Sequence, residues 1–331
     1  MSYRCIGVSF IVIAVVVLMP MFAVAQSTAS SRTPWGAPDL QGVWDFRTVT
    51  PLERPDEFEG KAFLTDQEAN EFEQKLAATR VDRRPDEGNT GTYNQFWFDR
   101  GTSVVSDRRT SLIVDPSDGK IPTLTPAAIK RKAEMERARA GAGFHEVAPG
   151  GFVEDLGPGG LQLRCITGFN SGPPMTPAAY NNNVQLFQTE DYVVLLNEMN
   201  HNARIVPLDG RAHIDLPQWT GDSRGHWEGD TLVVETSNFL RETSFMRGGA
   251  SKHLHLVERF TRVSGDMLVY EAAVDDPTMW TSQWTYEVPM TKSPDPLYEY
   301  ACHEGNYGLY NILAGARVEE AAAEALARGS K

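Results

Sequence analysis

One short pattern occurs twice in the second half of the chain, and it restricts the fold more than any other feature. The first copy is Trp227-Glu-Gly-Asp-Thr-Leu-Val-Val-Glu235, and the second is Val263-Ser-Gly-Asp-Met-Leu-Val-Tyr-Glu271. Each copy places Gly-Asp directly before an apolar run, because a tight hairpin needs a residue that accepts a positive φ and one that hydrogen-bonds its own backbone. The pattern predicts a second half built from β-hairpins.

Apolar runs of strand length continue this pattern toward the C-terminus. Turn signals separate them at Glu190-Asp191, Asp209-Gly210, Gly229-Asp230 and Gly265-Asp266. The spacing predicts strands at 184–187, 192–196, 203–206, 231–234, 254–260, 267–274, 283–288 and 297–301, and a further strand at 42–49. Short strands joined by hairpins predict an all-β fold, either an antiparallel barrel or a sandwich.

Helices are expected in three places. Thr65-Asp-Gln-Glu68 is a capping box that predicts a helix over 65–80. Thr125-Pro126 starts a mostly charged helix that ends near Gly141, and a last helix is expected over 318–328. Because long β barrels and sandwiches often form one unit, we expect residues 26–331 to be a single β domain with a helical and loop insertion at about 51–180.

The N-terminus has the pattern of a secretory signal peptide. Arg4 precedes an apolar run from Ile6 to Leu18, which is followed by Pro20 and the small residues 23–25. We expect residues 1–25 to be removed, which predicts a periplasmic or secreted protein with no stable membrane insertion. The alternative is an uncleaved anchor, since the apolar stretch approaches the roughly 20 residues that span a bilayer.

Charge and cysteine content agree with export. The net charge of −13 disfavours nucleic acid as a partner, because binding phosphates requires a basic surface. Cys5 leaves with the signal peptide, so Cys165 and Cys302 are the remaining pair. We expect them to form a disulfide that stabilises the fold by about 4 kcal/mol in the chain-entropy model. The alternative is two buried free thiols.

Two resemblances bear on the fold and the family. Gly42-Val43-Trp44 resembles the Gly-x-Trp opening of lipocalins and other calycin barrels, in which the tryptophan closes the barrel floor. This implies an all-β, calycin-like barrel with inserted helices. Nearly the whole mature chain is similar to an uncharacterised family of secreted proteins from environmental bacteria, a resemblance that implies no particular activity. It is carried by Trp35 to Trp44, Thr50 to Pro55, Tyr180 to Asn183, Pro207 to Arg211, Gly221 to Gly225, Trp227 to Thr236 and Tyr298 to Asn306.

The first candidate for chemistry is the polar segment that follows the predicted strand at 192–196. Within it, His201 is the candidate general base, Glu198 the group that orients it, and Arg204 a substrate-binding group. A carboxylate, an imidazole and a guanidinium within a few residues supply the equipment for proton transfer. The alternative is a polar loop whose asparagines satisfy their own backbone.

The second candidate lies directly after Cys302. A disulfide would hold His303 and Glu304 on a rigid support as a second acid/base pair, with Asn306 as a substrate-binding group. The alternative is a strand end at which Gly305 makes the turn.

Further substrate-binding candidates are side chains that donate hydrogen bonds and an aromatic side chain that offers an apolar surface. Asn182 and Asn183 offer amides to a hydroxylated ligand or a developing oxyanion, or they form a turn. In the segment 221–227, a guanidinium that suits a carboxylate or a sugar hydroxyl lies next to an aromatic side chain. The alternative is that the arginine pairs with the neighbouring aspartate and the tryptophan fills the barrel. The candidates in this segment are Asp222, Arg224, His226 and Trp227.

Metal and cofactor signatures are incomplete. His253-Leu-His255 resembles the His-x-His of cupins, but Glu258 comes one residue too early, and His303 to Asn306 is one residue short of the second cupin motif. Zinc-type Cys pairs, nucleophile elbows, phosphate loops and dinucleotide fingerprints are missing from the sequence. We therefore expect neither a metal nor a cofactor.

Together these features favour a cofactor-independent enzyme. The expected substrate is a small oxygenated organic molecule or saccharide, and the expected chemistry is general acid/base catalysis of the lyase, isomerase or hydrolase type. A non-catalytic barrel that binds a small apolar ligand is the alternative, and a structural envelope protein is a third possibility. A polar pocket would favour catalysis, and a pocket lined by Trp, Phe and Met would favour carriage.

Overall fold

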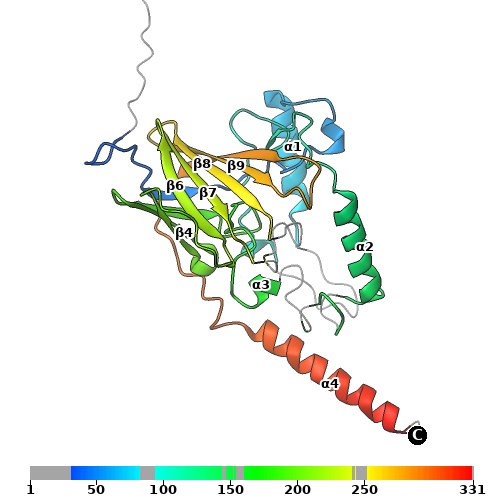
Figure 1. Cartoon of the computed structure of the whole chain (residues 1–331). Coiled ribbons are helices and arrows are strands. Elements are labelled where there is room, and N and C mark those ends of the chain that lie inside the picture. The colour runs from blue at the N-terminus through cyan, green and yellow to red at the C-terminus, as the bar shows by residue number, and fades with distance from the viewer. Residues whose placement is uncertain are drawn as a thin grey trace, which may run out of the picture.

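The computed structural model describes residues 31–82, 94–143, 147–151, 153, 160–240, 243 and 252–329. The expected signal peptide, residues 1–25, lies outside these residues. All ten strands of the described chain belong to one antiparallel sheet that curls into a nearly closed barrel (Figure 1). The all-β barrel fold is thus confirmed.

The sheet contains ten strands in the described residues, nine of them along the order β5-β4-β3-β1-β10-β9-β8-β7-β6, while β2 pairs with β10. The strands are β1 (Gly42–Asp45), β2 (Ile113–Asp115), β3 (Asn183–Gln188), β4 (Tyr192–Asn197), β5 (Ala203–Pro207), β6 (Asp222–Glu228), β7 (Thr231–Ser237), β8 (His255–Arg262), β9 (Met267–Asp275) and β10 (Trp284–Lys292).

The two edge strands, β5 and β6, approach each other and almost complete the barrel. Gly225 on β6 makes this approach possible, because a Cβ atom there would lie only 2.8 Å from Val206 of β5 and 2.7 Å from Leu208. The Arg204 guanidinium on β5 also lies 3.5 Å from the Ser223 hydroxyl on β6. Side chains, rather than a backbone ladder, therefore connect the edges in the described structure.

The barrel has two unlike ends. At the hairpin end, tight turns join β3 to β4 at Glu190-Asp191, β6 to β7 at Gly229-Asp230, and β8 to β9 at Gly265-Asp266, as the sequence predicts. Asp209-Gly210 instead starts a longer connection, since β6 begins only at Asp222. At the loop end, β1 runs into the long segment 46–182, which returns at β3, so the insertion is attached to this end alone.

Alternating positions on the strands fill the barrel. On β9, Leu268, Tyr270, Ala272 and Val274 are buried while their neighbours are partly exposed, the period-two pattern of a strand with one face in the core. Trp44 is fully buried toward the hairpin end, and its indole nitrogen donates to the Leu40 carbonyl at 2.8 Å. The Arg262 guanidinium lies 5.7 Å from the Trp44 ring. Trp280 and Trp284 also belong to the core, where the two rings pack edge to face with their centres 5.7 Å apart.

The longer helices start where the sequence predicts or earlier. They are α1 (Asp66–Thr79), α2 (Pro126–Arg139), the short α3 (Gly160–Leu163) and α4 (Tyr307–Gly329), with 3-10 turns η1 (Asp56–Phe58), η2 (Gln95–Trp97) and η3 (Met199–His201). The capping box of α1 is formed by Thr65 and Glu68, and Thr125 caps α2. Helix α4 begins eleven residues before the predicted Val318, because the Asn306 side chain accepts a hydrogen bond from the Leu309 amide at 3.2 Å and so caps an earlier start.

Two strand predictions are wrong, and two strands, β2 and β6, are absent from the prediction. Residues 297–301 form no strand; Tyr300 instead stacks near Tyr180, with the ring centres 6.4 Å apart. The predicted strand at 42–49 ends at Asp45, where the chain leaves for the insertion. Strand β6 was not predicted, because its sequence lacks an apolar run. It pairs on one side only, with β7, so its outer residues remain polar.

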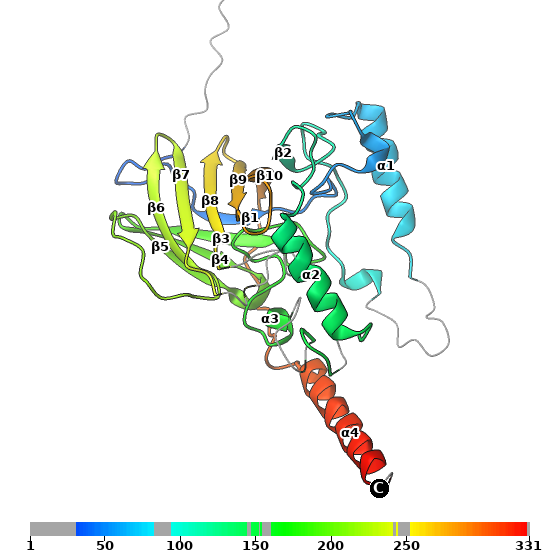
Figure 2. The same cartoon turned by 45° about the vertical axis from the view of Figure 1, so that its right-hand side comes forward.

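The helices lie outside the barrel. Helices α1 and α2 lie to the same side of it in both views, and α4 projects away from the body (Figures 1 and 2). From Arg317 to Gly329 every residue of α4 is exposed. In the described part of the chain, no helix is both long and apolar enough to cross a bilayer.

Candidate functional site

Polar residues occupy the interior of the barrel near its loop end. Strand alternation directs one residue inward from each of five consecutive strands around the wall, and each is at most 6% exposed. Polar groups buried in this way must be hydrogen-bonded, since an unpaired one costs on the order of 1–3 kcal/mol. These inward residues are Asn197 on β4, Arg204 on β5, Ser223 on β6, Thr236 on β7 and Glu258 on β8.

A bidentate ion pair crosses the barrel interior. The Arg204 Nη1 and Nη2 atoms donate to Glu258 at 2.6 and 2.9 Å, and the two side chains are 4% and 0% exposed. Burial lowers the pKa of Arg204, but the adjacent Glu258 charge raises it, and the pKa lies above its ordinary value. Arg204 therefore stays protonated as the partner of this carboxylate.

Two tyrosines extend the pair to the loop that closes this end. The Tyr270 hydroxyl donates to Glu258 at 2.9 Å and accepts from the Met175 amide at 3.0 Å. The Tyr286 hydroxyl donates to the Met175 carbonyl at 2.7 Å. Burial, and then the Glu258 charge, raise the pKa of both phenols well above the usual value, so both remain donors. We call the segment 170–177 that carries Met175 the plug.

Beside the plug, two buried amides have no hydrogen-bond partner in the described structure. Both polar side-chain atoms of Asn197 and of Asn200 are buried and unpaired, although the residues are only 2% and 5% exposed. Asn200 and His201 both have positive φ, 57° and 42°. Non-glycine residues with positive φ are uncommon, and two in succession mark a backbone held by its surroundings. Unpaired buried amides next to such a turn point to a ligand or ordered water that bonds to them.

Glu198, the proposed orienting residue, lies in this cluster. Its Oε2 accepts from the Asn183 amide at 2.8 Å, and the residue is 8% exposed. Asn183 and Glu198 are therefore brought together. His201 is exposed, and no side-chain hydrogen bond joins it to Glu198 in the described structure. The expected polarisation of His201 by Glu198 stays a prediction.

The second predicted acid/base pair lies elsewhere on the chain's surface. His303 and Glu304 are exposed in the turn before α4, and among the described residues no hydrogen bond or ion pair joins them to His201. Asn306 has structural partners: its side chain donates to the Leu163 carbonyl at 2.7 Å and caps α4. A pocket shared by His201 and His303 also stays a prediction.

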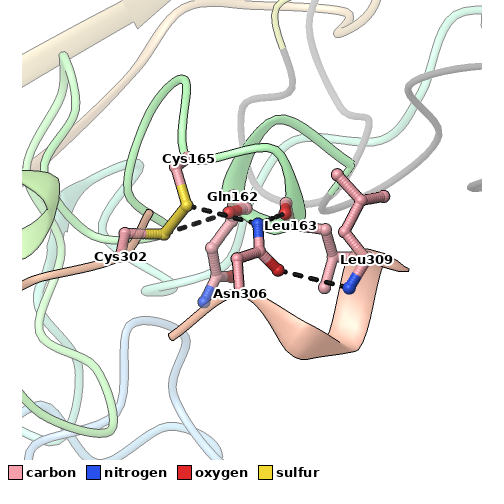
Figure 3. Close-up of a disulfide and its surroundings, with 6 residues drawn as sticks. All are labelled: Gln162, Leu163, Cys165, Cys302, Asn306 and Leu309. Atoms are coloured by element: carbon pink, nitrogen blue, oxygen red, sulfur yellow. Dashed lines mark hydrogen bonds between the residues drawn. A yellow bond between two sulfur atoms is a disulfide. The ribbon is translucent and has the colours of Figure 1, made fainter. Parts of the chain in front are cut away.

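The disulfide that supports this turn is confirmed. Cys165 and Cys302 are bonded, with Cα atoms 5.8 Å apart (Figure 3). The Asn306 side chain points toward the same bond, and its Nδ2 lies 3.4 Å from Cys165 Sγ. The start of α4 is thus fixed to the segment that precedes the plug. Disulfides of this kind persist in oxidising compartments.

The remaining predicted binding residues have structural roles wherever they make hydrogen bonds or core contacts. Asn182 is buried and bonded to the backbone of residues 99 and 178, and Trp227 packs against the barrel core. Asp222 accepts from Arg224 at 2.6 Å and lies 2.9 Å from His213, as in the alternative expected for this segment. His226 is exposed beside Glu228 at 3.2 Å.

The described residues contain no group of three or more His, Cys, Asp or Glu side chains placed to hold a metal ion. His255, of the cupin-like pair, is exposed and lies 3.9 Å from Glu235.

Most of the buried network is not among the predicted site residues. Glu258 has a sequence signal all the same, because it lies between the inward residues Leu256 and Phe260. A carboxylate at an inward position of a strand signals a buried partner. Arg204 is among the predicted site residues, but as a ligand-binding group.

No protein-family model matches the sequence, and no curated protein matches it either. The fold and site define a nearly closed antiparallel barrel with a buried ion pair and a plugged end.

Proposed function

We propose that this protein binds a small oxygenated organic molecule at the loop end of the barrel and acts on it by general acid/base chemistry. The observation that carries the proposal is the pair of buried amides of Asn197 and Asn200, which have no partner in the described structure. An amide presents both donors and an acceptor, so two adjacent amides suit a ligand rich in hydroxyl or carbonyl groups. Such groups would also remove the cost of leaving the amides unpaired.

The acid and base are the two titratable side chains of the same turn. One Glu198 oxygen is held by Asn183, which fixes the direction of the carboxylate. His201 lies three residues further on and is accessible from solvent. Imidazole is the side chain best suited to exchange protons near neutral pH. We assign His201 as the general base and Glu198 as the group that orients or polarises it.

The barrel interior supports a polar ligand over an apolar one. An ion pair and two tyrosine hydroxyls lie in its interior near the loop end, whereas carriers of apolar molecules need a pocket lined by apolar side chains. The disulfide, together with the signal-like N-terminal sequence, supports action in the periplasm or outside the cell.

The test has a binding arm and a turnover arm. Purified protein is heated with monosaccharides, lactones and hydroxy acids at millimolar concentration, and we expect one class to raise the melting temperature. Asn197→Leu should abolish that rise, because it removes the amide, while Gln185→Leu on the adjacent strand β3 should keep it.

The turnover arm uses the compounds that bind. His201→Asn should lower turnover by about 100-fold or more while leaving binding intact, which is the usual size of a general-base contribution. His255→Asn, an exposed histidine on β8, is the matched control. Full turnover by the folded His201→Asn variant would eliminate His201 as the base, and failure of that variant to fold would indicate a structural role.

A further inference from the structure

A cavity lies on the outer wall of the barrel. It has a volume of about 520 Å³, a size typical of small-molecule sites, and it lies between the outer face of β10 and the segment 98–106. Pro289 and Thr291 of β10 form one wall. Three arginines and two aspartates line the cavity, so its electrostatics decide what it can hold: Arg47, Arg80, Arg100, Asp45 and Asp99.

Arg47 is fully engaged by both aspartates. Its Nε donates to Asp45 at 2.7 Å, and its Nη1 donates to Asp99 at 2.6 Å. The hydrogen bond to Asp45 raises the pKa of Arg47 above the ordinary arginine value, despite partial burial. Arg47 therefore shapes the cavity and leaves no donor pair for a ligand.

Arg80 and Arg100 have no carboxylate partner in the described structure. Arg80 donates to the Gly101 carbonyl at 2.6 Å, and the Arg100 guanidinium lies over the Phe98 ring at 3.8 Å. Partial burial lowers the pKa of Arg100, and the positive charge of Arg80 lowers it further. Two guanidinium groups that repel each other beside one cavity are stabilised by an anion placed between them.

The charge balance of the lining sets the charge of that anion. Three arginines against two aspartates leave one positive charge, on a protein whose net charge is −13. A single negative charge neutralises the site, and a phosphate dianion exceeds it. The hydroxyls of Thr102 and Ser103 also line the cavity and can bond to ligand hydroxyls.

The backbone at the rim is shaped for close approach. Gly101 has a φ of +76°, and a Cβ atom there would lie 3.1 Å from Arg47 Cβ and 3.3 Å from the Thr48 nitrogen. A side chain at this position would press the segment 98–106 away from residues 47 and 48. Glycine therefore keeps Arg100 close to the cavity wall.

The geometry points to a binding site in this cavity for a small monocarboxylate that also carries hydroxyl groups, a molecule of the sugar-acid class. Arg80 and Arg100 hold the carboxylate, the hydroxyl side chains contact the ligand hydroxyls, and Phe98 keeps the Arg100 guanidinium in place. The lining of this cavity contains neither His201 nor Glu198, so the site is distinct from the acid/base residues at the loop end.

Isothermal titration calorimetry on the full mature protein tests the assignment with three probes: D-glucuronate, D-glucose and inorganic phosphate. Glucuronate should bind, glucose should give no measurable heat of binding, and phosphate should bind more weakly than glucuronate. Arg80→Gln and Arg100→Gln should each weaken glucuronate binding by about tenfold or more, the usual effect of losing a charge-assisted hydrogen bond. Arg211→Gln is the matched control, since it removes the same charge from an exposed arginine that pairs with Asp209 elsewhere.

Several results would overturn the proposal: no glucuronate binding, phosphate binding as tight as glucuronate binding, or equal losses in the Arg100→Gln and Arg211→Gln variants. If the cavity variants fail to fold, the salt dependence of the wild-type protein tests the proposal instead. Glucuronate affinity must fall as ionic strength rises. Asn197→Leu separates this site from the loop end. It should leave glucuronate binding unchanged, and a loss would place glucuronate at the plug.

Discussion

At the scale of single residues, the ion pair of Arg204 and Glu258 is the least expected feature of the barrel. Neither side chain reaches solvent, and removing both from water is costly. The attraction between them, together with the Tyr270 hydrogen bond, offsets that cost. Removing only one partner destabilises the fold, because the other charge is then left buried and unpaired.

We therefore predict a non-additive mutational result. Arg204→Met and Glu258→Leu should each lower the free energy of unfolding by about 3–5 kcal/mol, while the double variant should lose far less than the sum. Urea denaturation of the four proteins measures the coupling. Additive losses would show that the two charges do not stabilise one another.

The sequence identifies Arg204 as a notable residue more readily than Glu258. Arg204 stands out in a polar segment, whereas Glu258 requires knowing which face of β8 points inward. Alternation alone supplies that face, since Leu256 and Phe260 are buried on either side of Glu258. Which arginine pairs with it depends on how the barrel closes, because β5 and β8 are not neighbours in the sheet. That distant contact has no signature in the sequence.

At the scale of elements, helix α1 begins with the capping box that its sequence predicts. The Thr65 side chain accepts from the Glu68 amide at 3.3 Å, and Glu68 accepts from the Thr65 amide at 2.9 Å. Lys61 also bonds to Glu68, and this bond, followed by those of Thr65, lowers the pKa of Glu68 to about 2. The carboxylate form is thus favoured by the folded helix.

A pH dependence follows from this pKa. A carboxyl group whose pKa is lowered by folding stabilises the protein above its unfolded pKa, and the contribution is lost as the pH falls toward the folded pKa. Glu68→Gln should therefore melt at a lower temperature than the wild type at pH 6, and the difference should vanish as the pH approaches about 2. Thermal melts across this range, with Glu71→Gln in the middle of α1 as control, provide the measurement. A difference that stays constant with pH would contradict the assignment.

Helices and strands can be predicted from the sequence where turns and caps determine them, but not where they depend on pairing with a distant strand. Hairpin turns and helix caps are local, so most of β3 to β10 and the starts of α1 and α2 follow from the sequence. Strand β6 has a polar sequence and forms because β7 lies beside it. The segment 297–301 finds no partner strand in the sheet, and Tyr300 stacks on Tyr180 instead.

At the scale of the whole molecule, the disulfide links two distant segments at the loop end. It joins the segment before the plug to the base of α4, across 137 positions of sequence. Cross-linking so long a loop restricts the unfolded chain strongly. The bond therefore stabilises the barrel and also fixes where the helix starts.

Cys165→Ser/Cys302→Ser should lower the free energy of unfolding by about 4 kcal/mol in the chain-entropy model. Guanidinium denaturation of the oxidised protein and the double variant measures the loss, and the wild type in reductant should match the variant. Equal stability with and without the bond would mean that the unfolded chain is already compact.

The plug has a consequence for variation. Tyr270 and Tyr286 hold the amide and the carbonyl of Met175, and its side chain is itself buried in the barrel core, only 1% exposed. Position 175 therefore tolerates few replacements, because proline removes the amide donor and a small side chain leaves a hole in the core. The segment is anchored twice at this one residue, through its backbone and through its side chain.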